Sequence, residues 1–183
     1  GVGDKTKNYK LCDFYIASSY KSYLPCTNYY DYASIDSIIE CLRYGARYLD
    51  LDIMCKDFSH CADPVICNGE EVGNWHYTNA LDLKETLDAI LKYAFSASFL
   101  KNSTDPLFIN FNFKTWENKT TIDKTANTIK EKLLHRLLPK KFSYQGRYTG
   151  ANLAITSIRK LEGKIIILSS GDIKDTKMDE ISN

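Results

Sequence analysis

Two short segments of this chain alternate apolar and polar residues with the period of two that a β-strand imposes. In residues 48–54 three aliphatic side chains share one face, and in residues 107–113 four large apolar side chains do so. The opposite faces carry the polar residues Asp50, Asp52, Asn110 and Asn112. In a closed barrel of parallel strands these side chains would converge on one polar pocket, whereas in an ordinary open sheet they would face solvent. The alternation alone allows both arrangements.

Segments with helical periodicity separate the strands. Ser34 suits a helix N-cap, an apolar stripe follows at positions 35, 38, 39 and 42, and Gly45 suits the end of that helix. We expect a second helix at residues 83–94 and a third whose apolar stripe is Ile122, Ala126, Ile129, Leu133 and Leu137. Further strands are expected at residues 14–18, 64–67 and 164–168, and a loop at residues 139–150. This order predicts an α/β domain built of strand–helix units.

Length and charge narrow the classes of function. The 183 residues suit one domain, which we place at residues 14–170 between an N-terminal segment, 1–13, and a polar tail, 171–183, that we expect to be mobile. The net charge of +1 gives no general attraction to nucleic acid, so we expect no nucleic-acid partner. No apolar run has the length of a transmembrane segment, and the polar N-terminus lacks a secretory signal. We therefore expect a protein that is not secreted.

All six cysteines lie in the first 67 residues. A domain of this size does not need disulfides to hold its core, so reduced thiols inside a cell or a virus particle are expected. The alternative is a metal site formed by Cys55, His60, Cys61 and Cys67. These residues lack the paired-cysteine spacing of such sites, which favours thiols that pack as small apolar side chains.

Six segments resemble, in order, the X region of eukaryotic-type phosphoinositide-specific phospholipase C. The family's opening motif, F-I-x-S-S-H-N-T-Y-L, is matched by FYIASSYKSYL at residues 14–24. Its helix, glycine, arginine and E-L-D strand are matched at residues 34–52, and its P-V-I-Y-H-G-H-T-L by PVICNGEEV at residues 64–72. The other matches are the helix at 83–97 and the strands at 106–113 and 163–168. The resemblance implies the first half of a (β/α)8 barrel, with four or five strand–helix units.

The resemblance also implies a mechanism with two histidines and a calcium ion, and the matching positions carry other residues. Tyr20 and Asn68 stand where the histidines would be. Neither is a good general base at neutral pH, because a phenol has a pKa near 10 and a carboxamide does not titrate. The positions of the calcium site are Lys21, Asp50, Asp52 and Asn112, so that a neutral ligand is replaced by a cation and a carboxylate by an amide. The positions that would hold substrate phosphates are Leu168, Ser169 and Ser170 instead of lysines.

These replacements predict a pseudo-enzyme that has no intact catalytic residues and binds no calcium cofactor. An ion pair between Lys21 and Asp50 or Asp52 is expected to fill the former metal pocket. We expect a structural or protein-interaction role, and the abundance of Lys, Asn, Ile and Tyr, as in AT-rich genomes of large DNA viruses, favours a component of a virion or capsid. One alternative is a lipid- or inositol-phosphate-binding module without turnover. Another is an active phosphodiesterase in which His60, His76 or His135 has become the base.

The X region alone is too short to close a barrel. A (β/α)8 barrel needs about 250 residues, and half of one leaves an open sheet edge and an uncovered apolar interior. Leu168 should lie at or near that edge. We therefore expect a partner protein, or a further segment of the same gene product, to complete or cover the half-barrel.

Overall fold

The computed structural model describes residues 8–25, 32–55, 63–72, 74–77, 79–114, 119–143 and 151–183. Within these ranges the main element is a six-stranded sheet in which β10, β7, β2, β3 and β6 are successive neighbours, and β1 also pairs with β2. Its strands are β1 (Ser18–Ser19), β2 (Tyr48–Cys55), β3 (Pro64–Ile66), β6 (Leu81–Asp82), β7 (Leu107–Phe113) and β10 (Ile165–Ser170). The strands β1, β2, β7 and β10 are parallel to one another. In this group β1 pairs with β2, β2 with β7 and β7 with β10.

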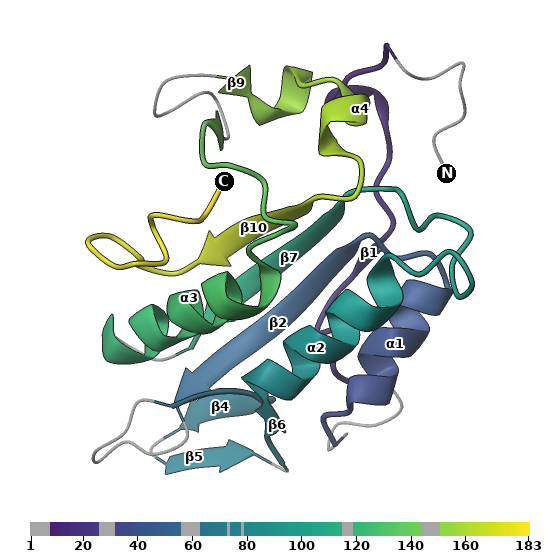
Figure 1. The fold of residues 1–183 in the computed structure, drawn as a ribbon. Coiled ribbons are helices and arrows are strands. Elements are labelled where there is room, and N and C mark those ends of the chain that lie inside the picture. Colours follow the sequence, from purple (N-terminus) through teal and green to yellow (C-terminus); the bar gives the residue numbers. More distant parts are fainter. Residues whose placement is uncertain are drawn as a thin grey trace.

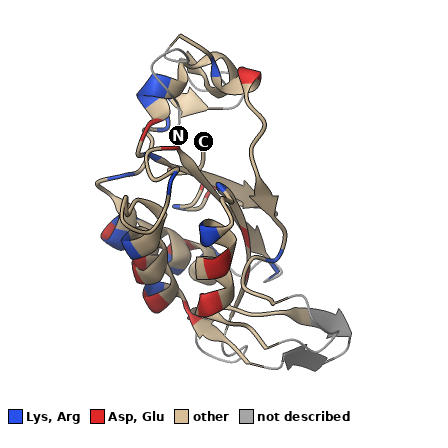
Figure 2. Ribbon diagram, turned by 90° about the vertical axis from the view of Figure 1, so that its right-hand side faces the viewer, with Lys and Arg blue, Asp and Glu red and all other residues tan. Residues whose placement is uncertain are grey.

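Helices return the chain between these parallel strands and cover one face of the sheet (Figures 1 and 2). They are α1 (Ile35–Arg43), α2 (Leu83–Ala94) and α3 (Lys119–Leu133). Parallel neighbours joined by helical crossovers form strand–helix–strand units. One helical layer over an open, mainly parallel sheet is half of a (β/α)8 barrel, which confirms the fold class predicted from the sequence.

The strand β3 departs from the strand–helix pattern. It runs antiparallel to β2, with Ile66 opposite Ile53, and β6 runs antiparallel to β3. The predicted strand at residues 64–67 therefore exists, but it belongs to an antiparallel extension of the sheet. The smaller elements are the hairpin β4 (Gly69–Val72) and β5 (Asn74–Tyr77), the pair β8 (Phe142–Ser143) and β9 (Ala151–Asn152), the 3-10 turns η2 (Leu11–Asp13) and η4 (Leu153–Ile155), and α4 (Ile158–Leu161).

The ends of α1 show how local sequence sets an element. The Ser34 side chain accepts a hydrogen bond of 3.1 Å from the Asp36 amide, so one of the donors left open at the helix start is satisfied. At the other end Gly45 has a φ of +96° and donates to the Leu42 carbonyl over 2.9 Å. A residue with a Cβ is strained at such a φ, which explains the glycine. Both predicted boundary residues are confirmed.

The core lies between the sheet and its helices. Apart from Phe113, which is partly buried, the apolar faces of β2 and β7 are completely buried against aliphatic residues of all three long helices. The principal members are Leu49, Leu51, Ile53, Ile109 and Phe111 from the strands, with Ile38, Leu42, Leu87, Ile90, Ala126 and Ile129 from the helices. Each leucine, isoleucine or phenylalanine among them contributes about 1.5–3 kcal/mol through burial. The predicted helical stripes and strand faces therefore meet in one cluster.

The face of the sheet opposite the helices is divided into two zones. At the N-terminal ends of the parallel strands, Phe108 and Ile166 are buried against Leu153 and Leu161. The segment that carries these leucines is tied to the N-terminal segment by a bridge between Lys10 and Ser157. Toward the C-terminal ends the same face turns polar. This polar zone is where a (β/α)8 barrel places its site.

Two predicted boundaries are wrong. The first strand covers only Ser18–Ser19 and is preceded by η2 and by residues 14–17, which form no regular element, instead of covering residues 14–18. Leu137 lies beyond the end of α3, where it forms a parallel bridge with Ile165 at the start of β10. The physical reason is the same in both places, because pairing to a neighbouring strand overrides the local apolar pattern. The predicted loop at 139–150 also contains β8, and residues 144–150 lie outside the described ranges.

The C-terminal tail has a defined place in the fold, although its polarity predicts a mobile segment. Its Met178 is completely buried in the main cluster, with Ile173 and Ile181 packed beside it. The tail thereby covers part of the sheet edge that was expected to be open.

Among the described residues, no helix combines the length and the apolar character that crossing a membrane requires.

Candidate functional site

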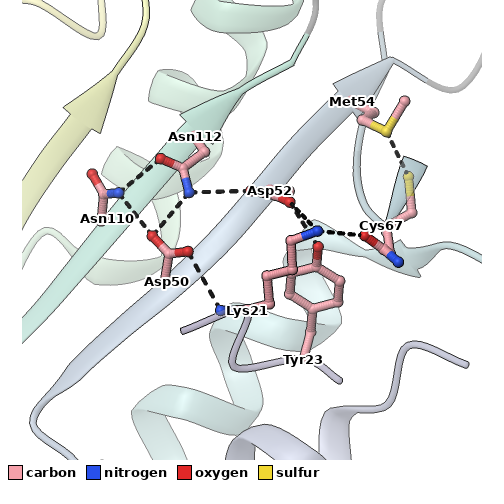
Figure 3. A network of polar contacts seen from close by, with 9 residues as sticks. Lys21, Tyr23, Asp50, Asp52, Met54, Cys67, Asn110 and Asn112 are labelled. Carbon is pink, nitrogen blue, oxygen red and sulfur yellow. Dashed lines mark hydrogen bonds and ion pairs between the residues drawn. The ribbon is translucent and has the colours of Figure 1, made fainter. Parts of the chain in front are cut away.

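The polar zone of the sheet contains one connected network of side chains (Figure 3). Asp50 and Asp52 come from β2, Asn110 and Asn112 from the adjacent positions of β7, and Lys21 and Tyr23 from the loop after β1. The register pairs Asp50 with Asn110 and Asp52 with Asn112. The two aspartates and the two asparagines, which alternate with core residues along their strands, are thus brought together on one face of the sheet. Of the two arrangements that the alternation allowed, the structure has the one in which these side chains converge on one polar pocket.

Asp50 is the centre of the network and is almost completely buried. Its Oδ1 accepts hydrogen bonds of 2.8 Å from the side-chain amides of Asn110 and Asn112. Its Oδ2 lies 3.4 Å from the backbone nitrogen of Lys21. Because a buried carboxylate is stable only when its oxygens are hydrogen-bonded, these donors explain how Asp50 is accommodated.

Asp52 is equally buried and has different partners. Its Oδ1 accepts from the Asn112 amide at 3.1 Å, and its Oδ2 accepts from the Tyr23 hydroxyl at 2.9 Å. The ammonium of Lys21 lies 3.9 Å from the same Oδ2. Each of the four carboxylate oxygens of Asp50 and Asp52 therefore accepts a hydrogen bond from within the protein.

Lys21 is held above this network by an unusual backbone. Its φ of +44° lies in the left-handed region that most residues with a Cβ avoid. The next residue fixes the loop to β2, because the Ser22 amide donates to the Asp50 carbonyl and the Ser22 hydroxyl accepts from the Asp50 amide, both at 2.9 Å. The Lys21 ammonium donates to Asn68 Oδ1 over 2.7 Å. Lys21 thus joins Asn68 to the carboxylates.

Two neighbouring groups stay protonated at neutral pH. Burial, reinforced by the Asp52 carboxylate, raises the pKa of Tyr23 far above its usual value. Burial and the same carboxylate raise the pKa of the Cys67 thiol to about 12. The Cys67 sulfur lies 3.2 Å from the Met54 sulfur in a small apolar cluster. Tyr23 therefore acts as a hydrogen-bond donor, and neither group supplies a base or a nucleophile.

The remaining predicted site residues are placed differently. Tyr20 is 75% exposed, with its ring 5.9 Å from the Lys21 ammonium, and has no hydrogen bond to either carboxylate among the contacts of Asp50 and Asp52 described above. Leu168 packs on the apolar zone of the same face, and Ser169 lies 2.6 Å from Ser182 of the tail. Ser170 lies 3.4 Å from Asn110 Oδ1 and is the member of this group that contacts the polar network.

The histidines and cysteines add no further ligands within the described part of the chain. His135 is exposed beside Arg136, whose carbonyl accepts from the first residue of β10, so it lies at the end of the sheet opposite the network. The side chains of His60, His76 and Cys61 lie outside the described residues. Cys12, Cys41 and Cys67 are free thiols, and Cys55 and Cys67 are buried. Among the described residues, no group of three or more His, Cys, Asp or Glu has metal-binding geometry.

Tyr23 is the network member that the sequence pattern did not indicate. It lies in a loop, where neither the period of a strand nor that of a helix assigns a direction to a side chain. It is nevertheless completely buried and bonded to Asp52. A signal was present in the opening motif, because the residues after β1 resemble a family segment that contributes to its site.

A half-barrel with a polar network at the C-terminal half of its strands defines the class of protein. The profile of the family described as "Phosphatidylinositol-specific phospholipase C, X domain" matches residues 7–170. The chain belongs to this family.

Curated relatives are much longer proteins. The chain is 33% identical over 98 residues to "Phosphoinositide phospholipase C 9" of Arabidopsis thaliana, an alignment that covers 52% of this chain and 17% of the relative. It is 25% identical over 167 residues to "1-phosphatidylinositol 4,5-bisphosphate phosphodiesterase 1" of Saccharomyces cerevisiae, which covers 91% of this chain and 16% of the relative. The chain thus spans less than a fifth of the length of either relative.

Solved structures support the same fold. The crystal structure of PLC21 from L. pealei has a TM-score of 0.65 at 20% identity, with 88% of this chain and 19% of that chain covered. A calcium-dependent phosphoinositol-specific phospholipase C from a Pseudomonas species has a TM-score of 0.63 at 10% identity, with 98% of this chain and 68% of that chain covered. At such low identity the likeness concerns the fold.

Proposed function

We propose that this chain is a catalytically inactive phospholipase C X domain with a structural or protein-interaction role. The observation that carries the proposal is the way the polar network is closed. All four oxygens of Asp50 and Asp52 are engaged by donors of the protein, and a lysine ammonium takes the place next to them. The two carboxylates are thus hydrogen-bonded within the protein and lie beside a cation of the same chain.

The residues present do not fit the calcium ion that the family uses. Calcium takes six to eight oxygen ligands, and the oxygens of this network already accept hydrogen bonds. The Lys21 ammonium lies 3.9 Å from Asp52, so a divalent cation bound there would be repelled at close range. Asn112 uses its amide nitrogen toward both carboxylates. No step through calcium is therefore part of the proposal.

The proton-transfer groups of the family also have no replacement among the described side chains. Asn68 accepts from Lys21 and cannot titrate, and Tyr20 is exposed. General acid–base groups contribute about 10²–10⁴-fold each to a rate, so the absence of both would abolish a useful turnover.

The alternative of a lipid- or inositol-phosphate-binding module is not favoured, because Leu168 and Ser169 are used in internal packing and in a contact to the tail.

The first test is an assay of hydrolysis. We expect no release of inositol phosphate from phosphatidylinositol or its phosphorylated forms, with or without calcium, because none of the described side chains beside the network replaces the two histidines of the family. A heat-inactivated sample supplies the baseline, and an active calcium-dependent phospholipase C supplies the positive control. Calcium-dependent release above the baseline would refute the proposal.

The second test is direct calcium binding. We expect calorimetry to detect no affinity tighter than the millimolar range, since binding would require the ammonium of Lys21 to leave and the hydrogen bonds to Asp52 to break. The variant Asp52→Ala is the matched control. Micromolar binding that disappears in this variant would contradict the expectation.

The interaction role and the location are tested together on native material. Co-purifying proteins, identified by mass spectrometry, are expected in place of co-purifying lipid. Recovery from cell extract or from purified virus particles would support the intracellular or virion location that the composition favours. Recovery from the secreted fraction would contradict it.

A further inference from the structure

The end of the sheet where the parallel strands begin is covered by a unit that we call the basic cap, residues 8–13, 139–143 and 151–162. It contains η2, β8, β9, η4 and α4, and Figure 1 shows the N-terminal segment beside α4 at this end of the molecule. Leu153 and Leu161 of the cap pack on the sheet through the apolar cluster described above. One side of the cap is thereby fixed to the sheet, and the other faces outward.

Backbone hydrogen bonds join the segments of the cap to one another. The Leu11 amide donates to the Thr156 carbonyl over 2.9 Å, and the Ile158 amide donates to the Tyr9 carbonyl over 3.0 Å. The strands β8 and β9 pair in parallel. Side chains that are far apart in the sequence are therefore held together on one unit.

The outward side chains of the cap include exposed cations that form no ion pair with a described residue. They are Lys10, Lys141, Arg159 and Lys160. The helical layer differs, because most lysines of α2 and α3 pair with a carboxylate, namely Lys84, Lys124, Lys130 and Lys132. Positive charge is thus neutralised locally on the helices and left unneutralised on the cap.

Acidic groups in and beside the cap do little to offset these cations. The Asp13 carboxylate accepts from the Lys10 amide over 2.8 Å and so serves the local turn. Glu162 is exposed at the end of α4, and Asp179 of the tail pairs with Lys140. The cap therefore has a local excess of positive charge, although the net charge of the whole chain is only +1. Such an excess attracts a partner of the opposite sign.

Exposed apolar side chains lie among the cations. Ile155 is 57% exposed and Tyr9 is 50% exposed. Ile155 ends η4, between β9 and the residue Ser157 that forms the bridge with Lys10. An apolar centre with a polar rim, with tyrosine and arginine present, is typical of a protein interface. A membrane surface would require a larger apolar area, and the phosphates of a nucleic acid would leave Ile155 unused.

We propose that the basic cap is the surface through which this chain binds an acidic segment of a partner protein. Carboxylates of the segment would face the exposed cations of the cap, and an apolar side chain between them would contact Ile155 and Tyr9. The partner would then bind at the end of the strands opposite the polar network. The inference rests on the proposed interaction role and names the chemistry of the partner.

The first test uses a synthetic acidic peptide, rich in glutamate and with leucine at its centre, as the probe. We expect the unmodified chain to bind it, and the affinity to fall at least about fivefold when the ionic strength is raised from about 0.05 to 0.3 M, because salt screens exposed charges. Absence of binding at the lower ionic strength, or an affinity that salt does not change, would overturn the proposal.

Charge reversal locates the binding surface. Lys160→Glu is expected to weaken peptide binding at least about fivefold, because it replaces an attraction by a repulsion, and Arg159→Glu should act alike. Lys119→Glu is the matched control, since it makes the same change of charge at an exposed lysine at the start of α3, outside the cap. Melting temperatures show whether each variant is folded. Equal affinities of the Lys160→Glu and Lys119→Glu chains would place the binding elsewhere and refute the proposal.

A second peptide, with the same glutamate content and serine in place of the central leucine, tests the apolar centre. The unmodified chain should prefer the leucine peptide, and Ile155→Ser should remove this preference while the salt dependence remains. A preference that survives in Ile155→Ser would contradict the role of Ile155.

The class of the partner is tested with vesicles that contain phosphatidylserine and with single-stranded DNA. Tighter binding of the unmodified chain to either of them than to the leucine peptide would overturn the assignment to a protein partner. Hydrolysis of phosphatidylinositol would refute the inactivity that we propose and leave the peptide result intact, so the two failures are distinguishable.

Discussion

Replacing Arg47 by methionine is expected to lower the free energy of unfolding by about 3 kcal/mol. The Arg47 side chain is buried, and its guanidinium donates to the Ala94 carbonyl over 2.7 Å, to the Pro106 carbonyl over 3.3 Å and to the Asp105 carbonyl. It thereby ties the end of α2 to the turn before β7. Burial lowers its pKa to about 10, which still leaves it charged at neutral pH. Methionine keeps most of the volume but leaves three carbonyls without their donor.

Arg43→Met is the matched control for this prediction. Arg43 is exposed and pairs with Glu40 one helical turn away, so its loss should cost at most about 0.5 kcal/mol. Arg47→Lys should fall between the two, since an ammonium keeps the charge without the planar set of donors. Denaturant unfolding of the three variants measures the differences. Equal midpoints for Arg47→Met and Arg43→Met would mean that water replaces the guanidinium.

The sequence predicted the central fold because its strongest patterns are local and periodic. The helix from Ile35 begins and ends at residues that suit caps, and β7 covers the predicted range of 107–113. The antiparallel direction of β3 and the return of the tail to β10 were not predictable in this way. Both depend on contacts between segments far apart in the chain, and no periodicity encodes such contacts.

The site was predictable in its strand residues and less so in its loops. Asp50, Asp52, Asn110 and Asn112 share one face of two paired strands. Alternation indicated the shared face within each strand, and the family resemblance favoured the barrel arrangement that brings the two strands together. Lys21 reaches the carboxylates, as the expected ion pair requires, but only through a left-handed backbone that a sequence pattern does not specify. Tyr20 and Tyr23 show the limit most clearly, since one is exposed and the other completely buried within the same loop.

Lys21→Ala is expected to lower the free energy of unfolding by about 2 kcal/mol. The ammonium lies near the buried Asp52 carboxylate and donates to Asn68, so its removal leaves the carboxylate with only neutral donors. The loss should remain below that of a completely buried ion pair, because 26% of the Lys21 side chain is exposed. Alanine has the same difficulty as lysine at a positive φ, and the comparison therefore isolates the side-chain contacts.

Two further variants decide whether the effect belongs to the pair. Lys101→Ala, at an exposed lysine away from the network, should leave the melting temperature unchanged. In a double-mutant cycle with Asp52→Asn, the combined loss should be smaller than the sum of the single losses, because each substitution removes the other's partner. If Lys21→Ala melts at the same temperature as the unmodified chain, the amides and Tyr23 satisfy the carboxylates without it. The ammonium would then be a member of the polar network that contributes nothing to its stability.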